Sequence, residues 1–269
     1  MLHPIKSVIA RNQGRMSRNY DKCVYGKKLK QFKGIHKGET CFIIGNGPSL
    51  KVEDLTRIYE LGIPSFAFNR IFCIFDETPW RPTYYISQDI NVTYGIEEQF
   101  KKLDLEYKLL PIRWKWYDEF TISNSYYYKT ITSGEDVFDF SKDFAKEVVD
   151  APTVAYTAFQ LAYYMGFKKF YLTGFDQNYK IAKDKDGNII VNDKLEKDYV
   201  SEKYRNEETD DLLIPNLYEM NKAFISLDHH IKSGNIDVEA YNATRGGMLE
   251  VFERKDLDEV FRELERKNK

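Results

Sequence analysis

The sequence predicts an α/β fold in which helices flank a mainly parallel β-sheet. Two units of similar design support this prediction. In the first, an apolar run at 41–44 meets the turn GNGPS, and apolar residues then recur at helical spacing to residue 61. In the second, a helical pattern at 153–165 ends at Gly166, and a strand at 168–173 ends in Gly-Phe-Asp. Alternating strands and helices with polar strand ends are typical of a parallel sheet.

The remaining elements follow in chain order and give a Rossmann-like arrangement. Further strands are expected at 64–69, 83–87, 107–112 and 237–242. Helices are expected at roughly 49–61, 95–104, 216–231 and 252–269. The aromatic stretch 113–150 is expected to be irregular. It either forms a wall of an acceptor site or is a surface excursion with its own aromatic cluster.

Composition narrows the class of protein. The formal net charge of the 269 residues is -2, which gives the whole chain no bias toward nucleic acid. Three cysteines occur without a CxxC pair or metal-ligand spacing, so we expect a reducing cytoplasm and no metal centre. No apolar stretch approaches the ~20 residues of a membrane span, and the apolar middle region of a signal peptide is missing.

Residues 1–35 form a basic arm, and residues 36–269 are expected to form one nucleotide-binding domain. Nine Lys and Arg oppose a single Asp in the arm. Ile5, Val8, Ile9 and Met16 allow a short amphipathic helix. Two interpretations are open: a solvated arm that packs on the domain or on another subunit, or attraction to the anionic inner face of a membrane.

A second charged region lies at 180–215, where Lys, Asp, Glu and Asn predominate and Tyr199 and Tyr204 are interspersed. A hairpin turn is expected near Gly187. Because this segment follows the predicted strand end at Asp176, we interpret it as a lid over a ligand; the alternative is a solvated insertion.

The turn that follows the first strand has the residues of a phosphate-binding loop. Glycines allow close approach of a ligand, and Pro48 suits the first helical turn. The positive end of the following helix would then face the anion. An ordinary strand-to-helix turn is the alternative, although it does not need the polar side chains of this loop. The candidate binding residues here are Gly45, Asn46, Gly47 and Ser49.

Other predicted strand ends also carry polar residues. Ligands of open α/β sheets lie beyond the carboxyl ends of the strands. The candidates at these ends are Asn69, Asp89, Gly174, Asp176, Asn242 and Arg245. Asp89 and Asp176 are suited to act as a general base or to hold Mg²⁺ on phosphates. Arg245 either neutralises a phosphate or carboxylate, or lies in a solvated turn. No HExxH, nucleophile elbow, P-loop or complete GxGxxG motif is present.

Several segments resemble the bacterial DUF115 proteins, also called 6-hydroxymethylpterin diphosphokinase MptE-like. They are GNGPSL at 45–50, FAFNRIF at 66–72, TPWRPTYYISQD at 78–89, PTVAYTAFQLAYYMGFKKFYLTGFDQNY at 152–179 and YNATRGGMLEVFER at 241–254. The resemblance spans most of 34–254 and leaves the basic arm outside. It implies a place among surface-polysaccharide genes. The kinase name implies ATP, Mg²⁺ and transfer of diphosphate to a hydroxymethyl group.

A more distant resemblance is to the family 42 sialyltransferases, which use a CMP-sialic acid donor without a metal. It implies that Asn46 and Asn69 contact the nucleotide, with Gly47 giving close approach. It also implies that Thr153 lies near the donor and Asp176 at the catalytic edge. The lid would be 180–215.

The sequence departs from these sialyltransferases at two places. Their Thr-Ser-Gly turn reads Thr153-Val154-Ala155 here, so a hydroxyl contact to the donor is lost. Their lid histidine has no counterpart in 180–215. The tyrosines that assist the leaving phosphate there have candidate replacements in Tyr179, Tyr199 and Tyr204. The donor therefore need not be CMP-sialic acid.

The leading hypothesis is a cytoplasmic glycosyltransferase-like enzyme of bacterial surface polysaccharide or lipopolysaccharide biosynthesis. It would take a nucleotide-activated sugar, with a CMP-linked sugar as one candidate, and a glycan or lipid-linked acceptor. Asp176 and Tyr179 are the expected catalytic residues, and no cofactor is required. The alternatives are a diphosphokinase using ATP and Mg²⁺, and a non-catalytic nucleotide- or glycan-binding module. The oligomeric state is open.

Overall fold

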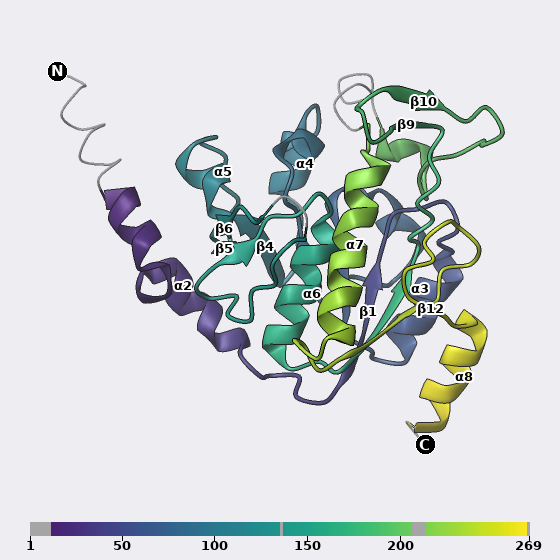
Figure 1. The fold of residues 1–269 in the computed structure, drawn as a ribbon, viewed down its shortest axis with the longest axis horizontal. Helices are drawn as coiled ribbons and strands as arrows, with labels where there is room; N and C mark the ends of the chain where they lie inside the picture. The colour runs from purple at the N-terminus through teal and green to yellow at the C-terminus, as the bar shows by residue number, and fades with distance from the viewer. Residues whose placement is uncertain (1–11, 135–136, 206–213, 268–269) are drawn as a thin grey trace.

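A computed structural model of the protein describes residues 12–134, 137–205 and 214–267 (Figure 1). Its centre is an eight-stranded sheet in which every neighbouring pair of strands is parallel. The strands in spatial order are β12 (Glu253–Arg254), β11 (Glu239–Asn242), β8 (Lys169–Thr173), β1 (Thr40–Ile44), β2 (Ser65–Phe68), β3 (Tyr84–Ile86), β4 (Tyr107–Pro111) and β5 (Ser125–Tyr128). The predicted parallel α/β fold is confirmed.

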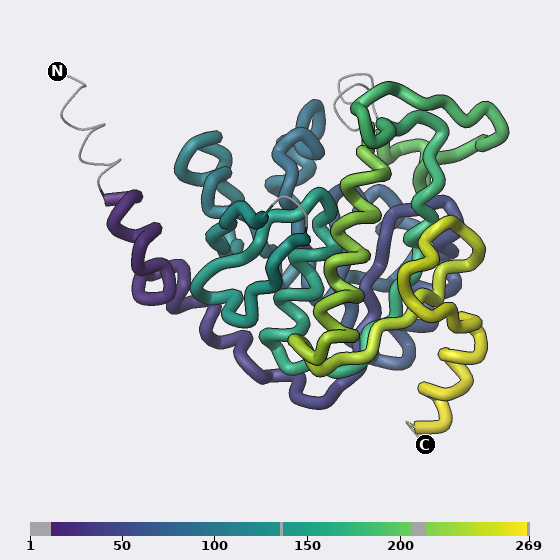
Figure 2. Tube along the Cα trace, in the orientation of Figure 1, coloured from purple at the N-terminus to yellow at the C-terminus, as the bar shows by residue number. Residues whose placement is uncertain are grey.

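Helices cover the sheet, as the chain trace shows (Figure 2). Residues 12–18 are helical, and the α-helices that follow are α2 (Val24–Leu29), α3 (Val52–Glu60), α4 (Glu97–Lys101), α5 (Ile112–Trp116), α6 (Val154–Met165), α7 (Leu217–Lys232) and α8 (Leu257–Lys267). The 3-10 helices are η1 (Tyr20–Lys22), η2 (Lys30–Phe32), η3 (Asn69–Glu77), η4 (Ile90–Thr93) and η5 (Glu202–Tyr204). Two small sheets pair β6 (Thr130–Ile131) with β7 (Val148–Val149) and β9 (Ile181–Lys183) with β10 (Ile189–Val191).

The core lies on both sides of β1 and β8. Residues Cys41 to Ile44 of β1 are fully buried, as expected for a central parallel strand. Helix α6 is buried on nearly all sides because it lies between the sheet and α7 (Figure 1). It ends at Gly166, whose φ of 95° is the left-handed conformation that the sequence predicted for a C-cap.

The first helix begins later than predicted. Helix α3 starts at Val52 rather than near residue 49, and Lys51 before it is extended. Leu50 N–H donates to Gly47 O at 3.2 Å, so the chain closes a turn before the helix begins. Pro48 therefore lies in that turn and not in the first helical turn, which corrects the expectation.

The stretch 113–150 is more regular than predicted. It contains most of α5 and all of β5, which extends the parallel sheet beyond β4. Its Ser-Tyr-Tyr-Tyr sequence pairs with Lys108 to Pro111. Aromatic residues have a high propensity for strands, and this was the available signal. The hairpin predicted near Gly187 is present as β9 and β10.

The described part of the basic arm packs against the edge of the sheet. Tyr20, Leu29 and Phe32 are buried in the core, and Tyr20 Oη donates to Tyr127 O of β5 at 2.8 Å. The ring of Phe32 packs against that of Tyr126 with centroids 4.9 Å apart. The arm thereby covers the open edge of β5. Ile5, Val8 and Ile9 lie outside the described residues.

Candidate functional site

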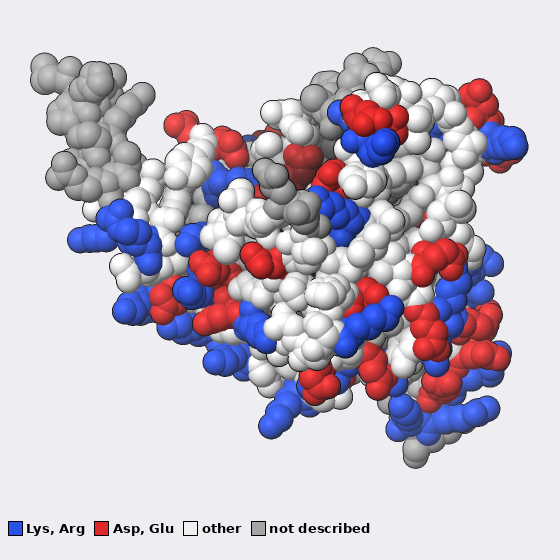
Figure 3. Space-filling model, in the orientation of Figure 1, with Lys and Arg blue, Asp and Glu red and all other residues white. Residues whose placement is uncertain are grey.

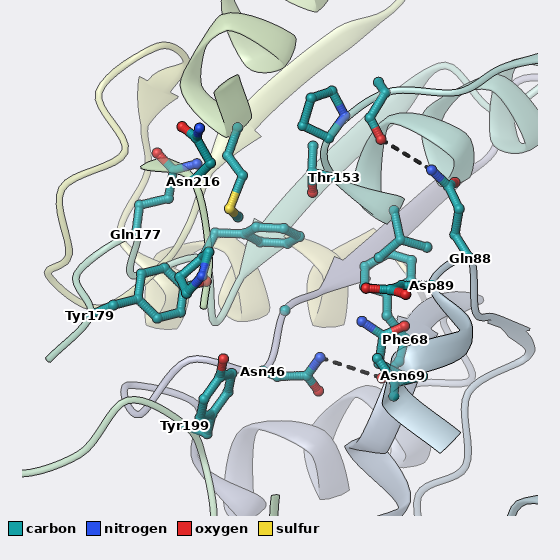
Figure 4. Close-up of a pocket in the computed structure, with 18 of the residues that line it drawn as sticks. Asn46, Phe68, Asn69, Gln88, Asp89, Thr153, Gln177, Tyr179, Tyr199 and Asn216 are labelled. Atoms are coloured by element: carbon teal, nitrogen blue, oxygen red, sulfur yellow. Dashed lines mark hydrogen bonds between the residues drawn. The ribbon is translucent and has the colours of Figure 1, made fainter. Parts of the chain in front are cut away.

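A cavity of about 390 Å³ opens at the carboxyl ends of the central strands. This size is typical of small-molecule sites. Figure 4 shows side chains from several strand ends, the start of α6 and the charged insertion converging on one space. The lining residues that the sequence singled out as binding or catalytic are Gly45, Asn46, Asn69, Asp89, Thr153, Gly174 and Tyr179. The structure thus brings these seven together, while their roles stay predictions.

The glycines of the GNGPS turn face protein atoms. A Cβ at Gly45 would overlap the carbonyl of Gly174, and a Cβ at Gly47 would overlap the carboxylate of Asp176. Across the same gap, Gly47 N–H donates to Gly174 O at 2.9 Å. These glycines therefore allow the ends of β1 and β8 to pack closely. The sequence had suggested close approach of a ligand instead.

Asp176 lies behind this turn and does not line the cavity. Its carboxylate accepts hydrogen bonds from Ser49 Oγ at 2.8 Å and Ser49 N at 3.4 Å. Burial raises the pKa of the Asp176 carboxyl above its usual range, and the bonds from Ser49 oppose that rise. Gly47 and Gly247 both pack against it so closely that a Cβ would overlap. Asp176, Ser49 and Gly47 are thus not brought to the cavity, and the carboxylate holds loops together.

Asn242 and Arg245 also lie outside the cavity lining. Asn242 is fully buried, and its Nδ2 donates to Leu249 O at 2.7 Å. The Arg245 guanidinium lies between the carboxylates of Asp54 and Asp258, at 3.0 Å and 2.9 Å. Hydrogen bonds from both acids raise the pKa of Arg245. Arg245 is therefore already paired with two carboxylates. The structure gives no support for the expected contact between Arg245 and a phosphate or carboxylate ligand.

Two cavity residues have unusual backbone conformations. Asn69 has φ of 51° and Gln177 has φ of 45°, in the left-handed region that non-glycine residues seldom adopt. Tyr85 Oη donates to Asn69 O at 2.5 Å, and Ser87 Oγ donates to Asn69 Oδ1 at 3.2 Å. Such conformations concentrate at functional sites because the surrounding structure must enforce them. Two of the four such residues in the described part of the chain line this cavity, while Glu119 and Asn124 lie elsewhere.

Four polar lining residues were missed by the sequence reasoning: Gln88, Arg113, Gln177 and Asn216. Arg113 forms an ion pair with Asp150, with Nη1 2.5 Å from Oδ2, and Nη2 donates to Gln88 O at 2.7 Å. Gln88 and Arg113 directly follow predicted strands, so the strand-end rule that selected Asp89 could have found both.

Among the described residues that line the cavity, Asp89 is the one that carries a carboxylate. It is exposed, and its Oδ1 accepts a hydrogen bond from Asn91 N at 2.9 Å as the N-cap of η4. Its second oxygen remains available to a ligand. No cluster of three or more His, Cys, Asp or Glu suited to a metal ion occurs in the described part of the chain.

The start of α6 borders the cavity through Ala151, Pro152, Thr153 and Val154. Thr153 is the N-cap, and its side chain accepts from Ala155 N at 3.4 Å. The first turn of α6 carries no acidic residue. The partial positive charge of this helix start therefore lies at the cavity without a competing carboxylate on that turn.

The charged region at 180–215 supplies an aromatic wall of the cavity through Tyr199 and Tyr204. Tyr199 and Tyr204 stack with ring centroids 4.0 Å apart, and Val200 N–H donates to Asn46 O at 2.8 Å. Buried Arg70 holds this wall by donating to Tyr204 O at 3.1 Å. Burial raises the pKa of Tyr179 and of Tyr204 well above the usual tyrosine range. Both phenols are therefore neutral near pH 7, when they can donate hydrogen bonds but cannot act as bases.

Two buried polar atoms of the lining have no hydrogen-bond partner among the described residues: Asn46 Oδ1 and Gln177 Nε2. Asn46 Nδ2 donates to Phe68 O at 3.4 Å, which fixes the orientation of that amide. Buried polar atoms are nearly always paired in folded proteins. An acceptor and a donor left unpaired in one cavity are available to a polar ligand.

Two comparisons with known proteins leave the activity of the chain open. No curated protein matches it. The solved structure of a MAf glycosyltransferase from Magnetospirillum magneticum AMB-1 is similar over 87% of this chain, with 14% identity and a TM-score of 0.49. This chain spans 39% of the length of that protein. A similarity this low assigns no activity.

A family model also matches the chain. The model of the 6-hydroxymethylpterin diphosphokinase MptE-like family matches residues 15–182, which is more than half of the chain. The match includes residues 15–35 of the basic arm, which we had expected to lie outside, and it ends before the segment at 241–254. The structure explains the first point, because Tyr20 and Phe32 belong to the core. The chain belongs to the 6-hydroxymethylpterin diphosphokinase MptE-like family.

Proposed function

We propose that the cavity binds the nucleotide part of an activated donor and that the protein is a transferase. The leading candidate is a glycosyltransferase that uses a nucleotide-activated sugar. The observation that carries this proposal is the start of α6, which opens without an acidic first turn into a cavity lined by amides and tyrosines. Helix starts of this kind bind phosphate.

The remaining walls suit a base and a sugar. Amide side chains donate and accept hydrogen bonds at once, as the edges of bases and sugars require. The cavity lining carries four such residues, Asn46, Asn69, Gln177 and Asn216, and a fifth, Gln88, whose amide is already bonded to protein groups. The rings of Tyr199 and Tyr204 offer apolar surface for stacking. A phosphate at α6 and a base near the tyrosines would span the cavity.

Charge favours a donor with few phosphates. The charged residues in the described lining are Asp89 and Arg113, and Arg113 is already paired with Asp150. The cavity therefore has no surplus positive charge for a triphosphate. The helix start contributes about half an elementary charge, which suits one phosphate better than three. This argument favours a nucleoside monophosphate sugar, of which a CMP-linked sugar is an example.

The chemistry would be a displacement at the anomeric carbon. The acceptor oxygen forms the new bond, the bond to the donor phosphate oxygen breaks, and the nucleotide leaves with the electron pair. The acceptor proton passes to a base. We assign that base to Asp89, because its free carboxylate oxygen lies in the cavity lining whereas Asp176 is bonded to Ser49 outside it.

A diphosphokinase is the second candidate, and the family description favours it. It would require ATP with Mg²⁺. The donor set fits a Mg²⁺ carried by substrate phosphates, with Asp89 as its protein ligand, since such ions often use one or two carboxylates. A bound Mg²⁺ would supply the positive charge that the lining lacks. The third alternative is a nucleotide- or glycan-binding module without catalysis.

A thermal-shift panel separates these candidates. The purified protein is heated with CMP, UDP, GDP, ATP, and ATP with Mg²⁺. Ligands that bind the folded state raise Tm. A free ligand concentration of 100 times Kd adds about 2.7 kcal/mol to the free energy of unfolding. A rise with CMP in EDTA supports the glycosyltransferase. A rise with ATP and Mg²⁺ alone supports the kinase, and no rise with any nucleotide overturns nucleotide binding.

A matched pair of variants locates the binding site. Asn69→Ala removes a cavity amide from a left-handed position, and Asn124→Ala does the same at an exposed turn with φ of 54°. Both substitutions carry a similar backbone cost. We expect the first to weaken nucleotide binding about tenfold, by the loss of one or two ligand hydrogen bonds, and the second to leave it unchanged. Equal affinities would place the nucleotide elsewhere.

A further inference from the structure

The charges of this chain are divided between its two parts. Residues 1–38 carry ten Lys and Arg and one Asp, whereas the whole chain has 40 basic and 42 acidic residues. The remaining residues therefore carry 30 basic and 41 acidic side chains. A net charge near zero conceals this division. Figure 3 shows basic side chains along the side of the molecule formed by the N-terminal helices.

The described lysines of this region have few acidic partners. We define the basic flank as the exposed residues Lys22, Lys27, Lys28, Lys30 and Lys33. Lys30 lies 3.6 Å from Asp21, and for the other four no carboxylate lies within 4 Å among the described residues. Elsewhere on the surface, pairs such as Lys168 with Asp237 are common. The flank therefore presents uncompensated positive charge to solvent.

The local helix places an apolar residue among these lysines. In α2, Gly26 and Leu29 face the core, so Val24, Lys27 and Lys28 share the opposite face at helical spacing. Val24 is 58% exposed. Burial of such an exposed apolar side chain against another surface is favourable, because it removes the side chain from water.

A second exposed apolar residue lies at the end of α5, which packs against the N-terminal helices. Trp116 packs against Tyr20 and Tyr25 with ring centroids 6.3 Å apart in each case, which brings the end of α5 to the start of α2. The next residue, Tyr117, is 70% exposed. Tyrosine is favoured where protein meets a lipid headgroup layer, because one end of the ring is apolar and the other is polar.

We propose that the basic flank, with Val24 and Tyr117, docks the protein on an anionic lipid bilayer. The complementarity is electrostatic, because anionic lipid headgroups attract clustered lysines. The apolar pair supplies shallow insertion, as in interfacial helices. No helix of the described residues is long and apolar enough to cross a membrane, so the contact is peripheral. Docking does not depend on which donor the cavity binds.

Nucleic acid is a weaker match for the same surface. A duplex is held by side chains that follow its phosphates and enter a groove, whereas α2 is short and lies flat on β5 through Tyr25 and Tyr127. The acidic remainder of the chain also repels an extended polyanion. A lipid surface needs only one flat face.

Vesicle sedimentation tests the proposal with the full chain. One set of vesicles is phosphatidylcholine and the other is an equimolar mixture with phosphatidylglycerol. We expect binding to the mixture only, lost when NaCl rises from about 0.05 M to about 0.5 M, because the Debye length shortens. Binding to both sets, or to neither, overturns the proposal.

A matched pair of quadruple variants locates the docking surface. The first changes Lys22, Lys27, Lys28 and Lys33 to Gln. The control changes Lys142, Lys185, Lys194 and Lys197 to Gln, which are exposed lysines outside the flank. Both lower the net charge by four. We expect at least tenfold weaker vesicle binding for the first and little change for the control, with the same Tm. Equal losses in both would show a general charge effect and overturn the proposal.

Two further measurements separate docking from simple attraction to polyanions. Val24→Ser with Tyr117→Ser is expected to weaken vesicle binding about threefold while every lysine is retained. A single-stranded RNA competitor is expected to leave vesicle binding unchanged at equal charge concentration. Displacement of the vesicles by RNA, with no effect of the serine variant, would assign the flank to nucleic acid instead.

Discussion

The helix starts of α3 and α6 lie at the same end of the sheet and differ in charge. Helix α3 follows the glycine-rich turn but begins only at Val52, with Glu53 and Asp54 in its first turn. Helix α6 begins at Val154 with no acidic first turn, and it borders the cavity. A carboxylate in the first turn satisfies the helix dipole that an anion would otherwise meet. The lesson is that the residues after a glycine turn decide whether it can bind phosphate.

The largest effect is expected when α6 receives an acidic residue in its first turn, as α3 has. Val154→Glu places a carboxylate on the first residue of α6, beside the proposed phosphate. Repulsion at the cavity is expected to cost roughly 3 kcal/mol, about 100-fold in nucleotide affinity. Isothermal titration with the nucleotide that shifts Tm measures the effect.

Val52→Glu is the matched control. It makes the same substitution at the first residue of α3, which is also half-buried. An acid at either helix start is compatible with folding, because it favours the dipole. We expect unchanged nucleotide affinity for Val52→Glu. A loss as large as that of Val154→Glu would return the phosphate to the glycine turn.

The next prediction concerns the turn itself. Gly47→Ala would place a Cβ against the Asp176 carboxylate and within 2.8 Å of Gly174 O. Overpacking of this kind costs about 2 kcal/mol, and thermal unfolding would record it as a lower Tm. Gly134→Ala, where the nearest atom lies 3.9 Å away, should leave Tm nearly unchanged. Full stability of Gly47→Ala would mean that the glycine does not serve close packing.

A smaller effect is expected at the cation of the cavity. Arg113→Gln leaves the Asp150 carboxylate beside the cavity without its cation, and repulsion of an anionic ligand is expected to reduce nucleotide affinity roughly tenfold, about 1.4 kcal/mol. Arg57→Gln is the control, because Arg57 is paired with Glu265 and is similarly exposed, at 33% against 35%. If both variants bind equally well, Arg113 serves only the fold.

Local pattern was sufficient for six strands of the sheet and insufficient for its edge strands β5 and β12 and for the site. Apolar strands with polar ends, and the cap at Gly166, follow from periodicity and chain chemistry, and they are present as predicted. The side on which Asp176 packs depends on the distance between β1 and β8, which no local pattern encodes. Arg113 was overlooked because its aromatic surroundings suggested an irregular segment, although it follows a predicted strand. The pairing of Arg245 with Asp54 joins residues 191 positions apart, beyond the reach of any motif.

The smallest expected effect tests whether Asp176 is structural. Burial raises the pKa of its carboxyl in the folded protein, so the protonated form is favoured by folding. The associated stability is fully present below the usual aspartate pKa and is lost as pH rises through the raised value. Asp176→Asn keeps a hydrogen-bonding oxygen for Ser49 and removes the charge. Its Tm should therefore exceed that of the wild type at pH 7, by less than the shift for Gly47→Ala, and the difference should vanish at low pH. A catalytic Asp176 would behave differently, because the same substitution would then abolish turnover while the cavity residue Asp89 could be changed without loss.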